Sequence, residues 1–270
     1  FARARRTSSS RGVHAGVLTF EPHPAKVLNP ALAPPLILTA PEKEQGIAAA
    51  GIDELCVLRF DHALASLMPA EFVQRVLVDR LGAGGVVVGD GFRFGHKAAG
   101  GVDDLRRALP IVEVVAPVKE DGLVCSSSKI RELVLEGKVD QAARLLGRPY
   151  QLAGTVVVGD RRGHTIGIPT ANVETTRELL PKLGVYATRA RVDGATYASV
   201  TNIGLRPTFT TGAPAPRIEA HLLGFSGDIY GKHLELDVVA RVRDEMRFPG
   251  VDALKAQIAK DIADAERILA

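Results

Sequence analysis

Apolar residues recur in two different rhythms along the first half of the chain: short runs typical of strands and longer stretches with helical spacing. The runs that favour strands are residues 17–20, 55–60, 86–88 and 112–116. The stretches that favour helices are residues 41–51, 69–81, 102–109 and the segment from 126 onward. Because the two kinds alternate, this half is predicted to be α/β, with a parallel, doubly wound, Rossmann-like sheet. In such sheets, ligands bind at the carboxyl ends of the strands.

The segment 69–81 has the clearest helical pattern of this half. Its apolar residues fall on one face, and they are Phe72, Val73, Val76, Leu77 and Leu81. Pro69 stands near its start and Gly82 follows its end, as is usual for helix termini. The uninterrupted valines at 86–88 are typical of a strand buried on both faces.

The second half favours antiparallel strands over residues 155–158, 185–192, 196–200 and 234–242. Asp193-Gly194 separates two of these runs and is a strong signal for a two-residue hairpin. The C-terminus has the apolar stripe of one helix, made of Val251, Leu254, Ile258, Ile262, Ala265 and Leu269. The pattern predicts a small closed antiparallel β-barrel with a C-terminal helix packed on it.

A domain boundary is predicted between residues 147 and 148. Gly147 follows a helical stretch, and Pro149 resists continuation of a helix. The predicted domains are therefore 1–147 and 148–270.

Composition narrows the class of protein. The chain has 270 residues, of which 46% are hydrophobic and 24% charged, as in an ordinary globular protein with room for two domains. The net charge of +3 is mild, and no basic face or aromatic interleaving suggests a nucleic-acid partner. No apolar run approaches the length of a membrane span, so no membrane partner is expected.

Cysteine and histidine usage points to a reducing cytoplasm and away from zinc. Cys56 and Cys125 are the two cysteines of the chain, too few for a disulfide framework. Neither they nor the seven histidines have metal-ligand spacing. The oligomeric state is left open, with a weak homo-oligomer as one option.

The segment 154–173 carries the most specific chemistry. A strand leads into a turn with Gly159, Gly163 and Gly167, and Pro169-Thr170-Ala171-Asn172 follows. Glycines let a backbone curl tightly and turn its N–H groups toward an anion. The Thr170 hydroxyl suits Mg²⁺ or a phosphate oxygen, and the Asn172 amide can hydrogen-bond to either. The competing interpretation is a plain β-hairpin corner.

The string GD-x-x-G-x-x-x-G-I-P-T-A-N resembles the ATP- and Mg²⁺-binding signature of bacterial riboflavin kinases. That kinase is usually the C-terminal half of a bifunctional riboflavin kinase/FMN adenylyltransferase, also called FAD synthetase. Four further segments resemble motifs of the same family in the expected order: 201–209, 218–223, 225–231 and 243–248. One small departure is His164, where the family usually has arginine.

The resemblance implies that the second half phosphorylates riboflavin to FMN with Mg·ATP. It implies ATP binding by Gly159, Asp160, Gly163, His164, Gly167, Pro169, Thr170 and Asn172, with Thr170 as the metal ligand. Glu219 occupies the family position of the general base, which accepts the proton of the ribityl hydroxyl. Without the resemblance, Glu219 would be interpreted as a solvent-facing strand residue. The resemblance also places Arg243, Glu245 and Phe248 in a mobile segment beside the flavin.

The first half carries its own string, Cys125-Ser-Ser-Ser-Lys-Ile-Arg131. Serines before an amphipathic helix are ordinary N-caps. Ser126, Ser127 and Ser128 at a helix N-terminus, together with Arg131, could instead hold a triphosphate. The string resembles the S-S-T-x-I-R motif of the adenylyltransferase half of the family, with Ser128 in place of threonine. That half transfers AMP from a second ATP to FMN, forming FAD and releasing pyrophosphate.

Segments 18–24 and 87–95 resemble two more motifs of the adenylyltransferase half. They imply a flavin site lined by Pro22, Pro24, Asp90 and Phe94, with Phe94 stacked on the isoalloxazine ring. The family usually has Asp or Asn directly before the first Phe of the second motif, where this chain has Gly91. Without the resemblance, Phe92 and Phe94 would be interpreted as core residues on one face of a strand.

The family's first motif, G-x-F-D-G-x-H-x-G-H, does not occur in the sequence, and residues 1–14 resemble the basic helix that follows it. The motif's histidines hold the ATP phosphates during adenylyl transfer. We therefore expect a longer gene product that carries this loop and makes FAD. The 270 residues alone should phosphorylate riboflavin but adenylylate FMN poorly. The alternatives are a kinase with a degenerate first domain and a flavin-binding protein without ATP turnover.

Overall fold

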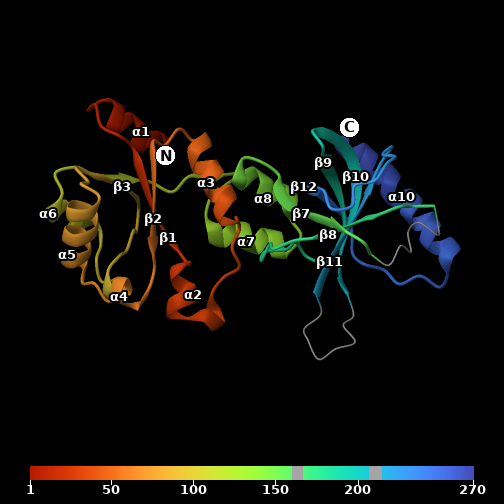
Figure 1. Ribbon diagram of the computed structural model, residues 1–270, viewed down its shortest axis with the longest axis horizontal. Coiled ribbons are helices and arrows are strands. Elements are labelled where there is room, and N and C mark those ends of the chain that lie inside the picture. The colour runs from red at the N-terminus through yellow and green to blue at the C-terminus, as the bar shows by residue number, and fades with distance from the viewer. Residues whose placement is uncertain (160–166, 207–214) are drawn as a thin grey trace. The chain divides into compact units, whose positions relative to one another are not determined.

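The structure is a computed structural model that describes residues 1–159, 167–206 and 215–270 (Figure 1). It divides the chain into two compact units, Phe1–Val118 and Lys119–Ala270. Each unit has its own architecture and is described separately.

The first unit alternates strands with helices, as the apolar pattern predicts. Its strands pair in parallel, β1 with β2 and β3 with β4. These two pairs share no strand among the described residues. The elements are α1 (Ala2–Ser9), β1 (Gly16–Glu21), α2 (Pro24–Leu28), η1 (Pro30–Leu32), α3 (Ala40–Ala49), β2 (Glu54–Arg59), α4 (His62–Ala65), α5 (Pro69–Glu71), η2 (Phe72–Arg80), β3 (Val86–Gly89), η3 (His96–Ala98), α6 (Val102–Ala108) and β4 (Val112–Val115).

The helix predicted over 69–81 is confirmed, and most of it is a π-helix. Pro69 opens it as α5, where its missing N–H costs no hydrogen bond, and η2 continues to Arg80. Its apolar face forms the core of the unit together with residues of the strands and of α6: Leu58, Phe72, Val73, Val76, Leu77, Phe94, Leu105 and Leu109. Val86 and Val88 pack on this core, whereas Val87 alternates to the other face. All three valines are half-buried, so the expected burial on both faces is wrong.

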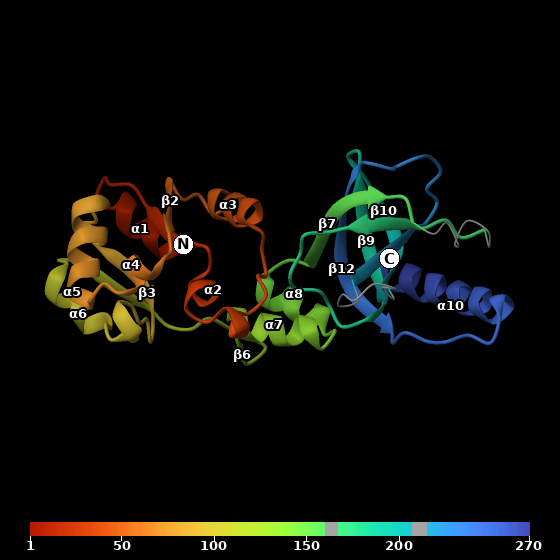
Figure 2. The ribbon, with the colours of Figure 1, turned by 60° about the horizontal axis from the view of Figure 1, so that its bottom comes forward.

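The second unit is built around a closed barrel, as predicted (Figure 2). Its strand order is β10-β11-β8-β7-β12-β9. Every strand pair recorded in it is antiparallel. The elements are β5 (Lys119–Glu120), β6 (Leu123–Val124), α7 (Ser127–Leu135), α8 (Val139–Leu146), β7 (Tyr150–Val157), β8 (Ala171–Glu174), β9 (Gly184–Val192), β10 (Ala195–Arg206), β11 (Ala215–Leu222), β12 (His233–Arg243) and α10 (Val251–Leu269).

Two local predictions about turns are confirmed in this unit. Asp193 and Gly194 join β9 to β10 with φ angles of 50° and 78°, the left-handed values that a two-residue hairpin requires. Gly147 ends α8 with a φ of 70°. The compact units divide at residue 118 instead, so α7 and α8 belong with the barrel. The domain limits 1–147 and 148–270 stay a prediction.

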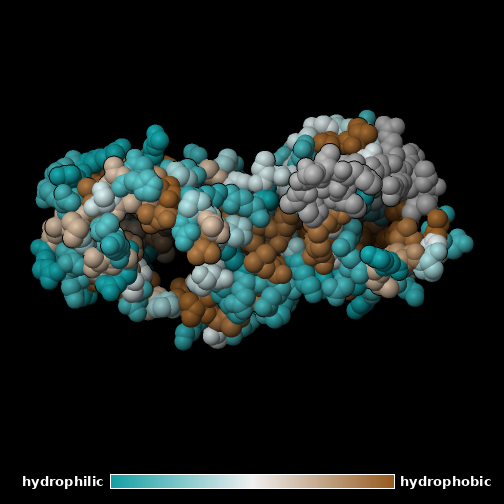
Figure 3. All heavy atoms as spheres, turned by 90° about the horizontal axis from the view of Figure 1, so that it is seen from below, coloured by the Kyte–Doolittle hydropathy of each residue, from teal (hydrophilic) through white to brown (hydrophobic). Residues whose placement is uncertain are grey.

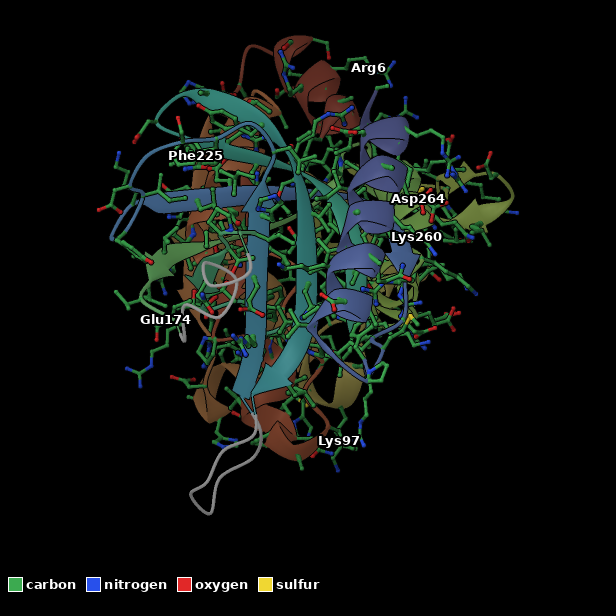
Figure 4. The ribbon with its side chains drawn as sticks, turned by 90° about the vertical axis from the view of Figure 1, so that its right-hand side faces the viewer. Arg6, Lys97, Glu174, Phe225, Lys260 and Asp264 are labelled. Carbon is green, nitrogen blue, oxygen red and sulfur yellow. The ribbon has the colours of Figure 1, made fainter. Side chains whose placement is uncertain are left out.

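The C-terminal helix α10 packs along the barrel (Figure 4). Ile262, Ala265 and Leu269 pack with residues of the strands beneath, among them Val185 and Val200. Figure 4 shows Lys260 and Asp264 on the outer side of the helix. Val251, predicted to start the apolar stripe, is exposed.

A buried ion pair also joins α10 to the end of β12. The Asp261 side chain is 3% exposed and accepts two hydrogen bonds from Arg243, at 2.8 Å from Nε and 2.7 Å from Nη2. Gln257 donates a third at 2.9 Å. Removal of either partner of such a buried ion pair leaves the other charge buried without compensation, which strongly destabilises the fold.

The face seen in Figure 3 carries both hydrophilic and apolar residues. In the view of Figure 3, hydrophilic residues predominate and apolar residues form scattered patches. No helix in the described ranges is both long enough and apolar enough to cross a membrane.

We expect Asp261→Ala to lower the free energy of unfolding of the barrel unit by about 3 kcal/mol, because it strands the half-buried Arg243 guanidinium. Urea unfolding followed by circular dichroism measures the change. Asp264→Ala, on the exposed side of the same helix, is the control and should change stability by no more than about 0.5 kcal/mol. Equal effects of the two variants would show that the Arg243–Asp261 pair does not stabilise the fold.

Candidate active site

Three neighbouring strands of the barrel bring an acidic residue between two amides. Glu219 lies on β11, where its cross-strand partners are Asn172 on β8 and Asn202 on β10. Residues directly opposite one another in antiparallel strands project to the same face. The three side chains therefore form one row across the sheet, called here the Asn172–Glu219–Asn202 row.

The carboxylate of this row is paired but accessible. Arg217, two positions earlier on β11, places Nη2 2.6 Å from Oε1 of Glu219. The exposed fractions of the two side chains are 22% for Arg217 and 21% for Glu219. Glu219 is therefore a partly enclosed carboxylate on a rigid strand, able to meet a substrate from solvent.

Two glycines let other segments approach the row closely. A Cβ atom on Gly159 would overlap the side-chain amide of Asn172, so the glycine-rich segment begins directly against this amide. A Cβ atom on Gly204 would overlap a carboxylate oxygen of Glu245. Because Gly204 is opposite Arg217 in the register, Glu245 reaches the same face as the row.

Thr170 lies at the edge of this site, directly before β8. The carbonyl oxygen of Pro169 is 2.7 Å from Nδ1 of His221, two residues beyond Glu219, which ties the segment to β11. Gly167 has a φ of 78°, a conformation that favours glycine. Asp160, Gly163 and His164, also predicted to bind ATP, lie outside the described residues.

The three predicted flavin residues, Arg243 at the end of β12 and Glu245 and Phe248 after it, differ in what they contact. Glu245 faces the row, as described above. Arg243 is engaged on three sides, by both oxygens of Asp261 and by the carbonyl of Asp244, and lies 5.8 Å from the centre of the Phe248 ring. These contacts of Arg243 hold the end of β12 against α10, and the Arg243–Asp261 pair is called the clamp here. Its role as a flavin ligand stays a prediction.

Asp244, which lies between Arg243 and Glu245, favours its ionised form. Hydrogen bonds from Arg241 and the nearby Lys182 ammonium lower its pKa to about 2. The segment after β12 is thus fixed by charge at Arg243 and at Asp244, immediately before Glu245.

The serine string at the start of α7 serves first as a helix cap. Oγ of Ser126 accepts a hydrogen bond of 3.2 Å from the backbone N–H of Lys129, which confirms the N-cap interpretation. Ser127 and Ser128 are exposed in the first turn, so their hydroxyls are accessible. Arg131 is half-buried, and burial lowers its pKa. Triphosphate binding by this string stays a prediction.

In the first unit, the predicted flavin residues follow the carboxyl ends of two parallel strands. Pro22 comes directly after β1, and Pro24 opens α2, whose first turn is capped by the ring of His23. Asp90 comes directly after β3 and is exposed. Ends of parallel strands are where α/β sheets bind ligands, and flavin binding by these residues stays a prediction.

Phe94 is a buried residue, and its stacking on flavin stays a prediction. It is 7% exposed and belongs to the core, with Phe72 at 5.6 Å and Phe92 stacked on it at 5.7 Å between ring centroids. The core interpretation of Phe94 is therefore confirmed. Since neighbouring rings cover Phe94, Phe92, at 38% exposed, has the accessible ring for stacking. Neither Phe92 nor Phe94 lies in a strand longer than a single bridge.

The sequence analysis missed two residues of this site, Asn202 in the row and Arg217 beside Glu219. Asn202 begins the segment N-I-G-L-R-P, and Arg217 shares the alternation of β11 with Glu219. Period-two alternation could have put Arg217 and Glu219 on one face. Sequence alone could not show that Asn202 pairs opposite Glu219. No group of three or more His, Cys, Asp or Glu able to hold a metal occurs among the residues that the structure describes.

Comparison with known proteins covers both units. Residues 146–269 match the riboflavin kinase family model, and residues 1–129 match that of FAD synthetase. The chain is 38% identical to the bifunctional riboflavin kinase/FMN adenylyltransferase of Pseudomonas fluorescens, over 100% of this chain and 87% of that protein. It is 37% identical to the enzyme of the same name from Listeria monocytogenes, over 99% and 86%.

A solved structure from Streptococcus pneumoniae, described as a macrolide-efflux protein, has the same fold. Its TM-score is 0.89 at 30% sequence identity, and the match covers 98% of this chain and 87% of that one. Both halves of the chain, its relatives and its fold thus agree, and the chain belongs to the family of bifunctional riboflavin kinases/FMN adenylyltransferases.

Proposed function

We propose that this chain phosphorylates riboflavin to FMN, with Glu219 as the general base, and adenylylates FMN to FAD with a second ATP. The enzyme is a transferase, as its two family matches indicate. The observation that supports the kinase site best is the Asn172–Glu219–Asn202 row with Gly159 against the Asn172 amide. We propose the limits 148–270 for the kinase and 1–147 for the adenylyltransferase. Both cysteines are free thiols, which supports a cytoplasmic location.

In the kinase reaction, Glu219 accepts the proton of the primary ribityl hydroxyl of riboflavin. The freed oxygen forms a bond to the γ-phosphorus of ATP, the bond from that phosphorus to the β-bridging oxygen breaks, and ADP leaves. The second oxygen of Glu219 is suited to this role, since Arg217 engages Oε1 and the side chain is 21% exposed. The neighbouring amides of Asn172 and Asn202 can orient the hydroxyl or a phosphate oxygen by hydrogen bonds.

The residues around Thr170 fit Mg²⁺ and phosphate. A hydroxyl and an amide oxygen are the hard ligands that this ion accepts beside water and phosphate. The absence of a Cβ on Gly159 leaves room for a backbone approach next to Asn172, as a phosphate cradle requires. We propose that Thr170 binds the ion and that Gly159, Gly167, Pro169 and Asn172 adjoin the nucleotide. We propose that Asp160, Gly163 and His164 bind the nucleotide as well. The bound ion neutralises charge on the phosphates.

For the adenylyl transfer, a phosphate oxygen of FMN attacks the α-phosphorus of ATP and pyrophosphate leaves. We propose that Ser126, Ser127, Ser128 and Arg131 bind the nucleotide, because serine hydroxyls at a helix N-terminus, two of them exposed, followed by a guanidinium suit phosphate. We propose that Pro22, Pro24 and Asp90 bind flavin in the first unit, together with the Phe92–Phe94 ring pair.

Replacing Glu219 by Gln keeps size and hydrogen bonding and removes proton acceptance. We expect kcat for FMN formation to fall by about 100-fold or more, with riboflavin affinity little changed. Chromatography of riboflavin and FMN gives the rate, and quenching of flavin fluorescence gives the affinity. Glu174→Gln is the control, because Glu174 is exposed on the neighbouring strand β8 (Figure 4). Near-normal turnover by the Glu219 variant would exclude it as the base.

Replacing Thr170 by Val keeps the shape and deletes the ligand oxygen. We expect the variant to need a higher Mg²⁺ concentration for half-maximal FMN formation, with the unfolding midpoint unchanged. Thr196→Val, at an exposed position of β10, should leave the Mg²⁺ titration as in the parent. Identical titrations for Thr170→Val and the parent would show that the hydroxyl does not bind the ion.

Replacing Arg131 by Gln should separate the two proposed activities of the enzyme. Loss of charge-assisted hydrogen bonds to phosphate should slow FAD formation by about 10-fold or more, while FMN formation from riboflavin stays unchanged. Both products are resolved in one chromatographic assay. Arg144→Gln on α8 is the matched control, because Arg144 is an exposed helical arginine. An equal loss of both activities would mean that Arg131 supports the fold instead of the nucleotide.

A further inference from the structure

Arg217 is the cation nearest to the proposed base in the described part of the barrel. Its Nη2 atom lies 2.6 Å from Oε1 of Glu219, the distance of a charge-assisted hydrogen bond. Both residues are on β11, which pairs with β8 on one side and β10 on the other. The pair is thus held by the middle one of three hydrogen-bonded strands, not by a loop.

We infer that Arg217 is a positioning residue for phosphoryl transfer, which holds the Glu219 carboxylate in the orientation that accepts the substrate proton. This inference rests on the proposed role of Glu219. A glutamate side chain has several rotatable bonds, and fixing them beforehand removes an entropic cost from the reacting complex. The planar guanidinium is suited to the task, because its donors are pre-organised. It engages Oε1, and within the described chain Oε2 accepts no hydrogen bond.

The strand opposite Arg217 leaves room beside its side chain. Its cross-strand partner on β10 is Gly204, which presents no side chain. The space above Gly204 is taken by the carboxylate of Glu245. The same face therefore carries two carboxylates, Glu219 and Glu245, with the Arg217 guanidinium on it. This arrangement also offsets the repulsion between a negative site and an incoming polyphosphate.

A surface ion pair with no role in catalysis is the competing interpretation, because such pairs usually contribute little. The barrel contains a suitable comparison in Arg191 of β9, which pairs with Glu235 and Asp237 of β12. That pair lies on other strands than the row, and the Arg191 side chain is 38% exposed, against 22% for Arg217. Arg191 therefore serves as the matched control for loss of a barrel arginine.

The test is a double-mutant cycle between Arg217→Met and Glu219→Gln, with kcat and KM for FMN formation as readouts. We expect Arg217→Met to lower kcat by about 10-fold, the effect of losing a hydrogen bond to a charged group. The KM for riboflavin and the KM for ATP should each change by less than about 2-fold. In the Glu219→Gln background, the same replacement should lower kcat by less than about 2-fold. Arg191→Met should leave kcat unchanged.

The outcomes separate this inference from the proposed function. Normal turnover by Glu219→Gln would overturn the assignment of the base, and this inference with it. Loss of turnover by Glu219→Gln, with the full Arg217→Met effect retained in the double variant, would overturn only the positioning role. A wild-type kcat for Arg217→Met would overturn it as well.

A conservative variant keeps the test valid if Arg217→Met does not fold, which a circular dichroism melt would show. Arg217→Lys keeps the charge but loses the planar fork, so it should retain an intermediate kcat in the parent background. In the Glu219→Gln background it should have no further effect. An additive effect of Arg217→Lys on kcat would overturn the positioning role in the same way.

Discussion

The register of β11 between β8 and β10 is the constraint on which the kinase site depends. It sets Glu219 opposite Asn172 on one side and Asn202 on the other, and it puts Arg217 on the same face. Because side chains alternate along a strand, a shift of one residue would turn all of these groups to the opposite face. Closure of the barrel opposes such a shift, since β11 pairs with β10 on one side and with β8 on the other.

Absent side chains are as important to this site as the groups that carry the chemistry. Gly159 lies against the Asn172 amide, and Gly204 lies under the Glu245 carboxylate, with no room for a Cβ in either place. Segments from before β8 and after β12 thereby converge on one row of the sheet. The clamp between Arg243 and Asp261 fixes the second of these segments to α10. Catalytic groups on strands, with loops brought in by glycine and charge, give a site that needs little reorganisation before reaction.

The first unit is built on parallel strand pairs instead of an antiparallel barrel. The apolar face of η2 forms much of its core. The residues expected to bind flavin follow the carboxyl ends of β1 and β3. The ring pair of Phe92 and Phe94 shows how one aromatic can serve the core while its neighbour keeps an accessible face. A motif that names both residues does not show which of them is buried, because burial depends on the packing of Phe72 from a distant helix.

Local features of this protein could be predicted from the sequence alone, because their causes lie within a few residues. The hairpin at Asp193-Gly194, the helix end at Gly147 and the helix opened by Pro69 all follow from backbone preferences at those positions. The alternation of strands and helices predicted the α/β half, and the family motifs led to Glu219, Thr170 and Asn172.

Only the tertiary structure decided how distant segments meet. The pairing of Glu219 with Asn202, the reach of Glu245 over Gly204, the burial of Asp261 against Arg243 and the covering of Phe94 each join residues far apart in the chain. A periodic pattern states which face a residue occupies, but not which strand or helix will lie opposite. That choice is made by barrel closure and core packing, whose free energy belongs to the whole unit and to no single segment.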